Sequence, residues 1–365
     1  MEALTPEVEP ESNTAVVDFK KVEEFAGRML GDLAAASAHA LVYVGDQLGL
    51  FKALAKAPAT AEQLAQRLEL DARYVREWAS GLAAIGYFDY DPVKKTFILP
   101  AERAAVLADE NSPAFMAAAS SVIRTMYHSA DDIAKVFRTG GGFGWHQHHR
   151  CLFRGTERFF RPGYNTFLVD DWLKQLPGIT EQLEKGGRVL DVGCGHGAST
   201  IIMAQAFPNS HFIGVDNHPG SIDAARAAAE TAGVSDRVEF QVANARSLPE
   251  GPYDLICYFD CLHDMGDPVG AARAAHGKLK PEGSVLLVEP LAEDALEDNF
   301  NPLGAMFYAG STFLCTPCSK SQEIGLALGA QAGPARLTGV LEGAGFSRVR
   351  VATRSMANLI FEAKP

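Results

Sequence analysis

The chain has 365 residues and a mass of 39.2 kDa, which at roughly 150 residues per domain predicts two or three domains. Hydrophobic residues make up 47% and charged residues 21%, a balance typical of a globular protein with a sizeable core. The formal net charge of −12 argues against nucleic-acid binding, which ordinarily needs a basic face. No apolar run approaches the roughly 20 residues that cross a membrane.

The N-terminal residues 1–17 are acidic and predict a disordered tail. They have neither the basic start nor the apolar core of a signal peptide, so we expect a cytoplasmic protein whose cysteines are reduced thiols. The six cysteines are Cys151, Cys194, Cys257, Cys261, Cys315 and Cys318. The last two have the CxxC spacing of redox and metal sites, which is a weak signal without a second pair nearby and is equally typical of buried core cysteines.

Residues 18–110 predict a winged-helix domain. Three stretches have apolar residues at helical spacing; in the second of them Thr60 and Gln63 have the pattern of a capping box, and the third ends at Gly86. Two short β-prone runs then flank a polar turn, which predicts a hairpin behind a helix-turn-helix. The helices are predicted at 19–54, 60–68 and 72–85, and the hairpin strands at 87–90 and 96–99.

Residues 111–185 predict a helical linker that is interrupted by three glycines at 140–142. Its most unusual feature is Trp145-His-Gln-His-His149, where three imidazoles fall within four residues. These histidines, with Cys151 close by, have the chemistry of metal ligands, but they equally fit a polar pocket or a solvated loop. We assign no metal and expect Trp145 and His146 to line a substrate pocket.

From residue 186 to 365, short apolar runs alternate with helical patterns. This alternation predicts an α/β domain with a doubly wound parallel sheet. The strands are predicted at 188–192, 211–215, 238–242, 253–259 and 284–289, with two more at 348–352 and 358–363, and the helices at 199–206, 221–232 and 269–279.

A glycine-rich loop follows the first of these strands. In Val189-Leu-Asp-Val-Gly-Cys-Gly-His-Gly197, glycines let the backbone turn tightly and approach a ligand. Asp216 ends the second strand, 25 positions after Asp191 (216 − 191), where an acid can hold both ribose hydroxyls of an adenosine ligand. Nicotinamide-dependent dehydrogenases share this layout but use G-x-G-x-x-G, whereas this loop has G-x-G-x-G.

The loop closely resembles the first motif of class I S-adenosylmethionine-dependent methyltransferases, and the resemblance covers residues 186–292. Lys280-Pro-Glu-Gly-Ser-Val-Leu-Leu-Val-Glu289 resembles the turn into the fifth strand of that family's seven-stranded Rossmann-like sheet. Asn244 stands where the family often has an acid, and an amide oxygen can still accept the hydrogen bond. The resemblance implies S-adenosylmethionine as cofactor, bound by Asp191, Gly193, Cys194, Gly195, Gly197, Asp216, Asn217, Asn244, Ala245, Phe259 and Asp260.

Asp260-Cys-Leu-His-Asp-Met-Gly-Asp267 follows the fourth strand. It resembles the His-Asp element of winged-helix small-molecule O-methyltransferases, which implies that His263 is a general base for the methyl acceptor. A structural role for His263, as a helix cap or against the cofactor backbone, remains open, and Asp264 either orients the imidazole or caps the turn.

The order of the domains resembles the bacterial winged-helix methyltransferases, which implies a homodimer and a small-molecule acceptor, with no membrane and no nucleic acid as partners. We predict methyl transfer, with oxygen as the preferred acceptor and nitrogen or sulfur open. The alternative is a ligand-responsive regulator, or a protein that binds the cofactor without catalysis; three basic against six acidic residues between 60 and 91 argue against DNA binding. The predicted substrate pocket consists of Trp145, His146, Phe160, Met306 and Phe307.

Overall fold

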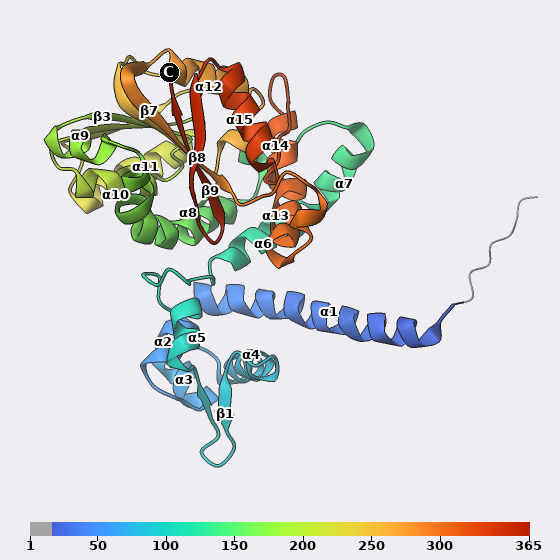
Figure 1. The fold of residues 1–365 in the computed structure, drawn as a ribbon. Helices are drawn as coiled ribbons and strands as arrows, with labels where there is room; N and C mark the ends of the chain where they lie inside the picture. Colours follow the sequence, from blue (N-terminus) through green and yellow to red (C-terminus); the bar gives the residue numbers. More distant parts are fainter. Residues whose placement is uncertain (1–16) are drawn as a thin grey trace, which may run out of the picture.

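The computed structural model describes residues 17–365, so the predicted tail falls outside the described residues except for Val17. Figure 1 shows a helical N-terminal part with a small hairpin, and a larger part in which helices cover both faces of a sheet. A long first helix projects away from the rest of the molecule.

The N-terminal part is the predicted winged helix. The single helix expected over 19–54 is two helices, because the chain turns at Gly49, whose φ of 71° is left-handed. The capping box is present: Gln63 N donates to Thr60 Oγ1 (3.2 Å) and Thr60 N donates to Gln63 Oε1 (3.0 Å). The elements are α1 (Phe19–Gln47), α2 (Leu50–Lys56), α3 (Ala61–Leu68), α4 (Ala72–Ala84), β1 (Asp89–Asp91), β2 (Thr96–Ile98) and α5 (Ala101–Leu107).

The first half of α1 is exposed on all sides. Only Ala38, Val42 and Gly45 of this helix are buried. Since apolar residues normally avoid water when they form a continuous row, the exposed row indicates a surface that lacks its partner in the single chain. Its exposed large residues are Phe19, Val22, Phe25, Met29, Leu30 and Leu33.

The linker is helical as predicted, but it holds a break that the sequence pattern did not reveal. Pro162 lies inside α8 and lacks an amide hydrogen, and a π-helical stretch, η2, follows directly. Arg158 on α8 is buried and donates to both oxygens of Asp46 on α1 (2.6 and 2.8 Å), which fixes the linker to the winged helix. The elements are α6 (Ala119–His128), α7 (Ala130–Thr139), η1 (Trp145–Gln147), α8 (Cys151–Gly163), η2 (Tyr164–Trp172), η3 (Leu173–Gln175) and α9 (Ile179–Lys185).

The sheet has seven strands in the order β5-β4-β3-β6-β7-β9-β8, which confirms the predicted fold. The first five strands in this order are parallel, whereas β9 runs antiparallel to β7 and β8. The strands are β3 (Arg188–Val192), β4 (His211–Asp216), β5 (Val238–Val242), β6 (Tyr253–Phe259), β7 (Leu279–Pro290), β8 (Arg348–Arg354) and β9 (Asn358–Lys364).

The strand β7 starts earlier than the predicted 284. Tyr253 pairs with Leu279 and Leu255 pairs with Ser284, so the predicted turn at Lys280–Gly283 is an irregular insertion within the strand rather than its boundary.

Two hydrophobic cores lie on opposite faces of the sheet. Consecutive strand residues such as Val189 and Leu190 belong to different cores, as the alternation of side chains along a strand requires. The helices α9, α10 (Ala198–Ala206), α11 (Pro219–Ala232) and η2 cover one core, and α12 (Pro268–His276) and α15 (Gly333–Gly343) cover the other.

The strand order reverses between β3 and β6, because β4 and β5 extend the sheet to one side and β7 extends it to the other. In open α/β sheets, ligands bind at the carboxyl ends of the strands at such a reversal. The fold therefore places a binding site there. Within residues 17–365, every helix is too short or too polar to cross a bilayer.

Candidate functional site

A cavity of about 490 Å³ opens at this reversal. One wall consists of the loops that follow β3, β4, β5 and β6, and the other is a face of α8. Of the predicted cofactor residues, nine line the cavity: Gly193, Cys194, Gly195, Asp216, Asn217, Asn244, Ala245, Phe259 and Asp260.

The glycine loop is held against the end of β4. The amides of Gly193 and Cys194 both donate to the carbonyl of Val215 (2.8 and 3.0 Å). Gly193 has a φ of 75°, and a Cβ there would lie 2.8 Å from the sulfur of Cys261, so no larger residue fits. Asp216 accepts from the amides of Gly195 (3.0 Å) and His218 (2.8 Å), which joins the two loops that would surround an adenosine ligand.

Asp191 and Gly197 do not line the cavity, contrary to the role expected for them. The carboxylate of Asp191 is fully buried below the loop and accepts from the hydroxyls of Ser199 and Thr200 (2.6 Å each). Burial raises the pKa of Asp191 to about 6. Asp191 therefore anchors the start of α10, and Gly197 is the point where the ring of Phe240 approaches the backbone too closely for a side chain.

The α8 wall is a helical stripe at spacings of three and four residues. Phe153 stacks on the ring of His218 with centroids 4.5 Å apart, which closes the end near Asp216. At the other end the hydroxyl of Tyr164 donates to Asp260 (3.2 Å), whose pKa is raised to about 7 by burial. The stripe consists of Phe153, Thr156, Glu157 and Phe160 of α8 and of Tyr164, the first residue of η2.

The structure brings only part of the predicted substrate pocket to the cavity. Trp145 and Phe160 line the cavity, whereas His146 and Met306 are exposed. In the tight turn η1, Trp145 faces inward and its neighbour His146 therefore faces solvent. Phe307 lies in α13 (Pro302–Gly310) and packs against a small cluster that includes Leu152 and Leu314 instead of the cavity.

The three linker histidines do not converge. His146 is exposed. His149 accepts a hydrogen bond from the amide of Cys151 (3.2 Å) and contacts Arg124 (2.9 Å). His148 is buried against Phe143 with both ring nitrogens unpartnered, and burial lowers its pKa to about 4. This arrangement does not form a metal-ligand set from the three imidazoles.

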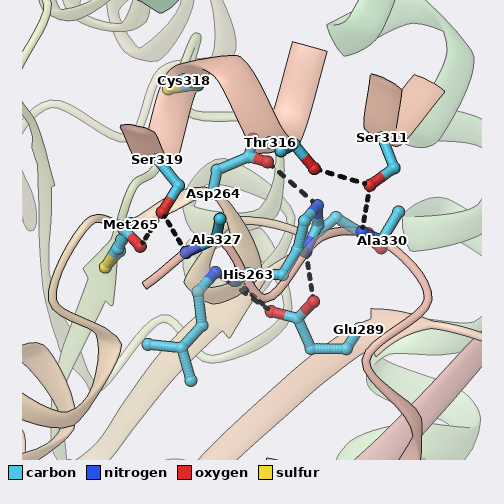
Figure 2. A network of polar contacts seen from close by, with 12 residues as sticks. His263, Asp264, Met265, Glu289, Ser311, Thr316, Cys318, Ser319, Ala327 and Ala330 are labelled. Carbon is cyan, nitrogen blue, oxygen red and sulfur yellow. Dashed lines mark hydrogen bonds and ion pairs between the residues drawn. The ribbon is translucent and has the colours of Figure 1, made fainter. Parts of the chain in front are cut away.

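His263 lies just behind the cavity in the short turn η4 (Leu262–Asp264). Figure 2 shows its ring between two carboxylates. Nδ1 bonds to Glu289 at the end of β7, and Nε2 lies 3.2 Å from Asp264 Oδ1. Glu289 also accepts from the amides of Leu262 (3.0 Å) and His263 (3.3 Å), so one buried carboxylate orients both the turn and the ring.

The two carboxylates decide the protonation of His263. Burial by itself disfavours the charged ring, but Glu289 and then Asp264 outweigh burial and raise the pKa of His263 well above its usual value. Asp264 lines the cavity while His263 is 3% exposed, so Asp264 separates Nε2 from the cavity. The sequence pattern indicates only that Glu289 ends a strand and does not reveal this role.

Cys315 approaches this pair. His263, Asp264 and Cys315 have donor atoms within 4.8 Å of one another, a geometry that can hold a metal ion, although the ion pairs of His263 account for the proximity without one. All six cysteines are free thiols. Burial raises the pKa of Cys315 and of Cys318 to about 12, so both stay protonated at neutral pH, unlike reactive redox cysteines.

The comparisons with known proteins agree with this architecture. Residues 183–341 match the model of a methyltransferase domain, and residues 36–109 match an Rv2258c-like winged HTH domain. The 27-O-demethylrifamycin SV methyltransferase of Amycolatopsis mediterranei is 35% identical over 125 residues, which are 33% of this chain and 43% of that protein. The chain spans less than half the length of the curated relatives that it matches.

Solved structures are similar over nearly the whole chain. The mitomycin 7-O-methyltransferase MmcR has a TM-score of 0.67 at 18% identity and covers 95% of this chain and 100% of its own. Human N-acetylserotonin methyltransferase, solved in complex with SAM, has a TM-score of 0.66 at 17% identity and covers 96% of this chain and 99% of its own. The chain therefore carries a methyltransferase domain at residues 183–341, which follows an Rv2258c-like winged HTH domain at residues 36–109.

Proposed function

We propose that this protein transfers a methyl group from S-adenosylmethionine to a small molecule. The observation that carries the proposal is the composition of one cavity: the glycine loop and Asp216 form one end, and Asp264 with His263 behind it forms the other. The methyltransferase domain match and the solved relatives support the same reaction.

The residues present fit this cofactor. Asp216 lies beside the glycine loop, where a carboxylate can accept from ribose hydroxyls, and Asn244 and Ala245 line the part of the cavity below β5. When bound, S-adenosylmethionine supplies a methyl group on a positively charged sulfur, which an aligned nucleophile attacks directly. Among the residues proposed to bind it, Asp191 and Gly197 act through the loop rather than by contact.

His263 is proposed as the proton acceptor, positioned by Glu289. The bond from Nδ1 to Glu289 directs Nε2 toward Asp264 and the cavity. A hydroxyl acceptor that takes the place of Asp264 at Nε2 gives its proton to the ring as its oxygen forms the new bond to carbon. Oxygen is the acceptor we favour, since a hydroxyl needs such a base whereas an ionised thiol does not.

The test is methyl transfer by the purified chain to a panel of phenols, aromatic amines and thiols, with S-adenosylhomocysteine release as the readout. We expect turnover with phenols, and His263→Ala should reduce it by about 10²–10⁴, the usual contribution of general acid–base catalysis. S-adenosylhomocysteine affinity, measured by calorimetry, should stay within a few-fold. Failure of the wild-type chain to bind the cofactor would refute the function, and an unchanged rate in the variant would refute only the role of His263.

The partner that we propose for the exposed row on α1 is a second copy of this chain. Six apolar side chains on one free helix are a large surface to leave in water, and pairing two copies buries both rows at once. Leu30→Glu should shift light scattering at micromolar concentration from twice the chain mass to the chain mass. A monomeric wild-type chain would contradict this proposal.

The six free thiols favour a reducing compartment such as the cytoplasm.

A further inference from the structure

The cavity is unusually acidic. Six carboxylates line it, and Arg246 is the single lysine or arginine among the lining residues. Arg246 already forms ion pairs with Glu323 (2.6 Å) and Asp267 (3.7 Å). Two of the six carboxylates therefore have a positive partner in the cavity lining. The four that remain are Glu157, Asp216, Asp260 and Asp264.

Three of these four carboxylates already have polar partners in the structure. Asp216 accepts from two backbone amides, and Asp260 accepts from Tyr164 and from Asn358 (2.8 Å). Asp264 lies against His263. Glu157 is different because its single ion-pair partner, Arg161 at 3.2 Å, is half-exposed and is shared with Glu110 (3.0 Å).

The position of Glu157 is fixed from outside the cavity. Its neighbour Arg158 is buried in the ion pairs to Asp46 and Glu110, which hold this turn of α8 in place. The Glu157 side chain is only 17% exposed, and burial, which outweighs the nearby arginines, raises its pKa. A largely buried carboxylate with only a half-exposed counter-charge is stabilised by a cation placed in the cavity.

We propose that Glu157 is a cofactor-binding residue whose carboxylate pairs with the positive charge on the sulfur of S-adenosylmethionine and makes the cavity prefer the methyl donor over the product. This inference rests on the proposed function. Methyl transfer breaks the sulfur–carbon bond and leaves the electron pair on sulfur, so the product S-adenosylhomocysteine has one positive charge fewer than the donor. The attraction from Glu157 is therefore present before transfer and lost after it, which favours release of the product.

The experiment compares three ligands by calorimetry on the full-length chain: S-adenosylmethionine, S-adenosylhomocysteine and sinefungin, which has an amine in place of the sulfonium methyl. In Glu157→Gln, the two ligands with the extra cation should bind about five- to tenfold more weakly, while S-adenosylhomocysteine should change little. Glu157→Asp should keep most of the discrimination. Glu181→Gln, which removes the same charge from an exposed position on α9, is the control and should leave all three affinities unchanged.

Arg161→Met tests the same inference in the opposite direction, because it leaves Glu157 in place and should strengthen its effect. It takes away the cation that now offsets Glu157, so the preference for S-adenosylmethionine over S-adenosylhomocysteine should increase. Equal losses for all three ligands in Glu157→Gln, or an unchanged preference in both variants, would overturn the inference and leave the proposed function standing. No binding of any ligand to the wild-type chain would overturn both.

Discussion

One wall of the cavity is made by loops at the carboxyl ends of neighbouring strands, whereas the opposite wall is one face of a helix that is anchored to another domain. On the sheet side, Val215 and Asp216 hold the glycine loop through backbone hydrogen bonds. On the α8 side, the wall stays in place through the buried pairs of Arg158 with Asp46 and Glu110. The sheet wall therefore depends on local geometry, and the helix wall depends on contacts to residues 112 and 48 positions away in the chain.

This difference predicts that substitutions in the two walls change different properties. The largest expected effect is on the stability of the fold and comes from the helix wall. Arg158→Met leaves Asp46, whose side chain is 5% exposed, buried without a counter-charge, which typically costs about 3–5 kcal/mol. Urea unfolding should show this loss. Arg73→Met, in an exposed pair with Glu77 on α4, is the control and should lose little or nothing. Equal stability of the two variants would mean that the helix wall does not depend on this anchor.

Substitutions in the sheet wall should lower the affinity for the cofactor rather than the stability of the fold. Asp216→Asn keeps the shape of the side chain but weakens the bonds to Gly195 and His218 and removes the charge that we propose to face the ribose. We expect S-adenosylhomocysteine to bind at least about tenfold more weakly, a loss of about 1.4 kcal/mol or more. The exposed Asp223→Asn on α11 should bind normally. If Asp216→Asn binds as tightly as the wild-type chain, the nucleotide lies elsewhere.

The smallest of these three effects is a shift in the pH dependence of the rate, and it concerns His263, which lies behind the cavity in η4. The ring must be neutral to accept a proton, and its pKa is raised above 6.5 by the two carboxylates, so the wild-type rate should increase with pH above this value. Glu289→Gln removes one of those charges, lowers the pKa of His263 and should move the increase to lower pH. The amide oxygen can still accept from Leu262 and His263. A pH–rate profile that is identical in both proteins would show that His263 does not set it.

The sheet wall could be predicted from the sequence because its residues follow strands whose pattern is local. The glycine loop, Asp216, Asn244 and Asp260 lie where the spacing placed them. Asp191 does not line the cavity, and the pattern could not show this, because it shows that an acid precedes the loop but not that the hydroxyls of Ser199 and Thr200 donate to its carboxylate.

The helix wall could be predicted only in part. Phe160 was found, but Glu157 and Tyr164 were missed, because nothing in the linker sequence shows which face of α8 meets a sheet that begins about 25 residues later. Likewise, His146 was expected in the pocket but is exposed, since the direction of each side chain depends on the turn at Trp145–Gln147. Glu289 was missed because its partner lies 26 residues away and meets it only when β6 and β7 pair.

The two strands at the margins of the sheet have a consequence for how the molecule behaves at high concentration. An open strand offers free backbone groups to any other chain, and charged side chains make such pairing unfavourable. The marginal strand β8 has Arg348, Arg350 and Arg354, and the opposite margin, β5, has Glu239 and Gln241. Growth of β-sheet aggregates from either margin is thus disfavoured, which leaves the apolar row of α1 as the surface proposed to pair with a second copy.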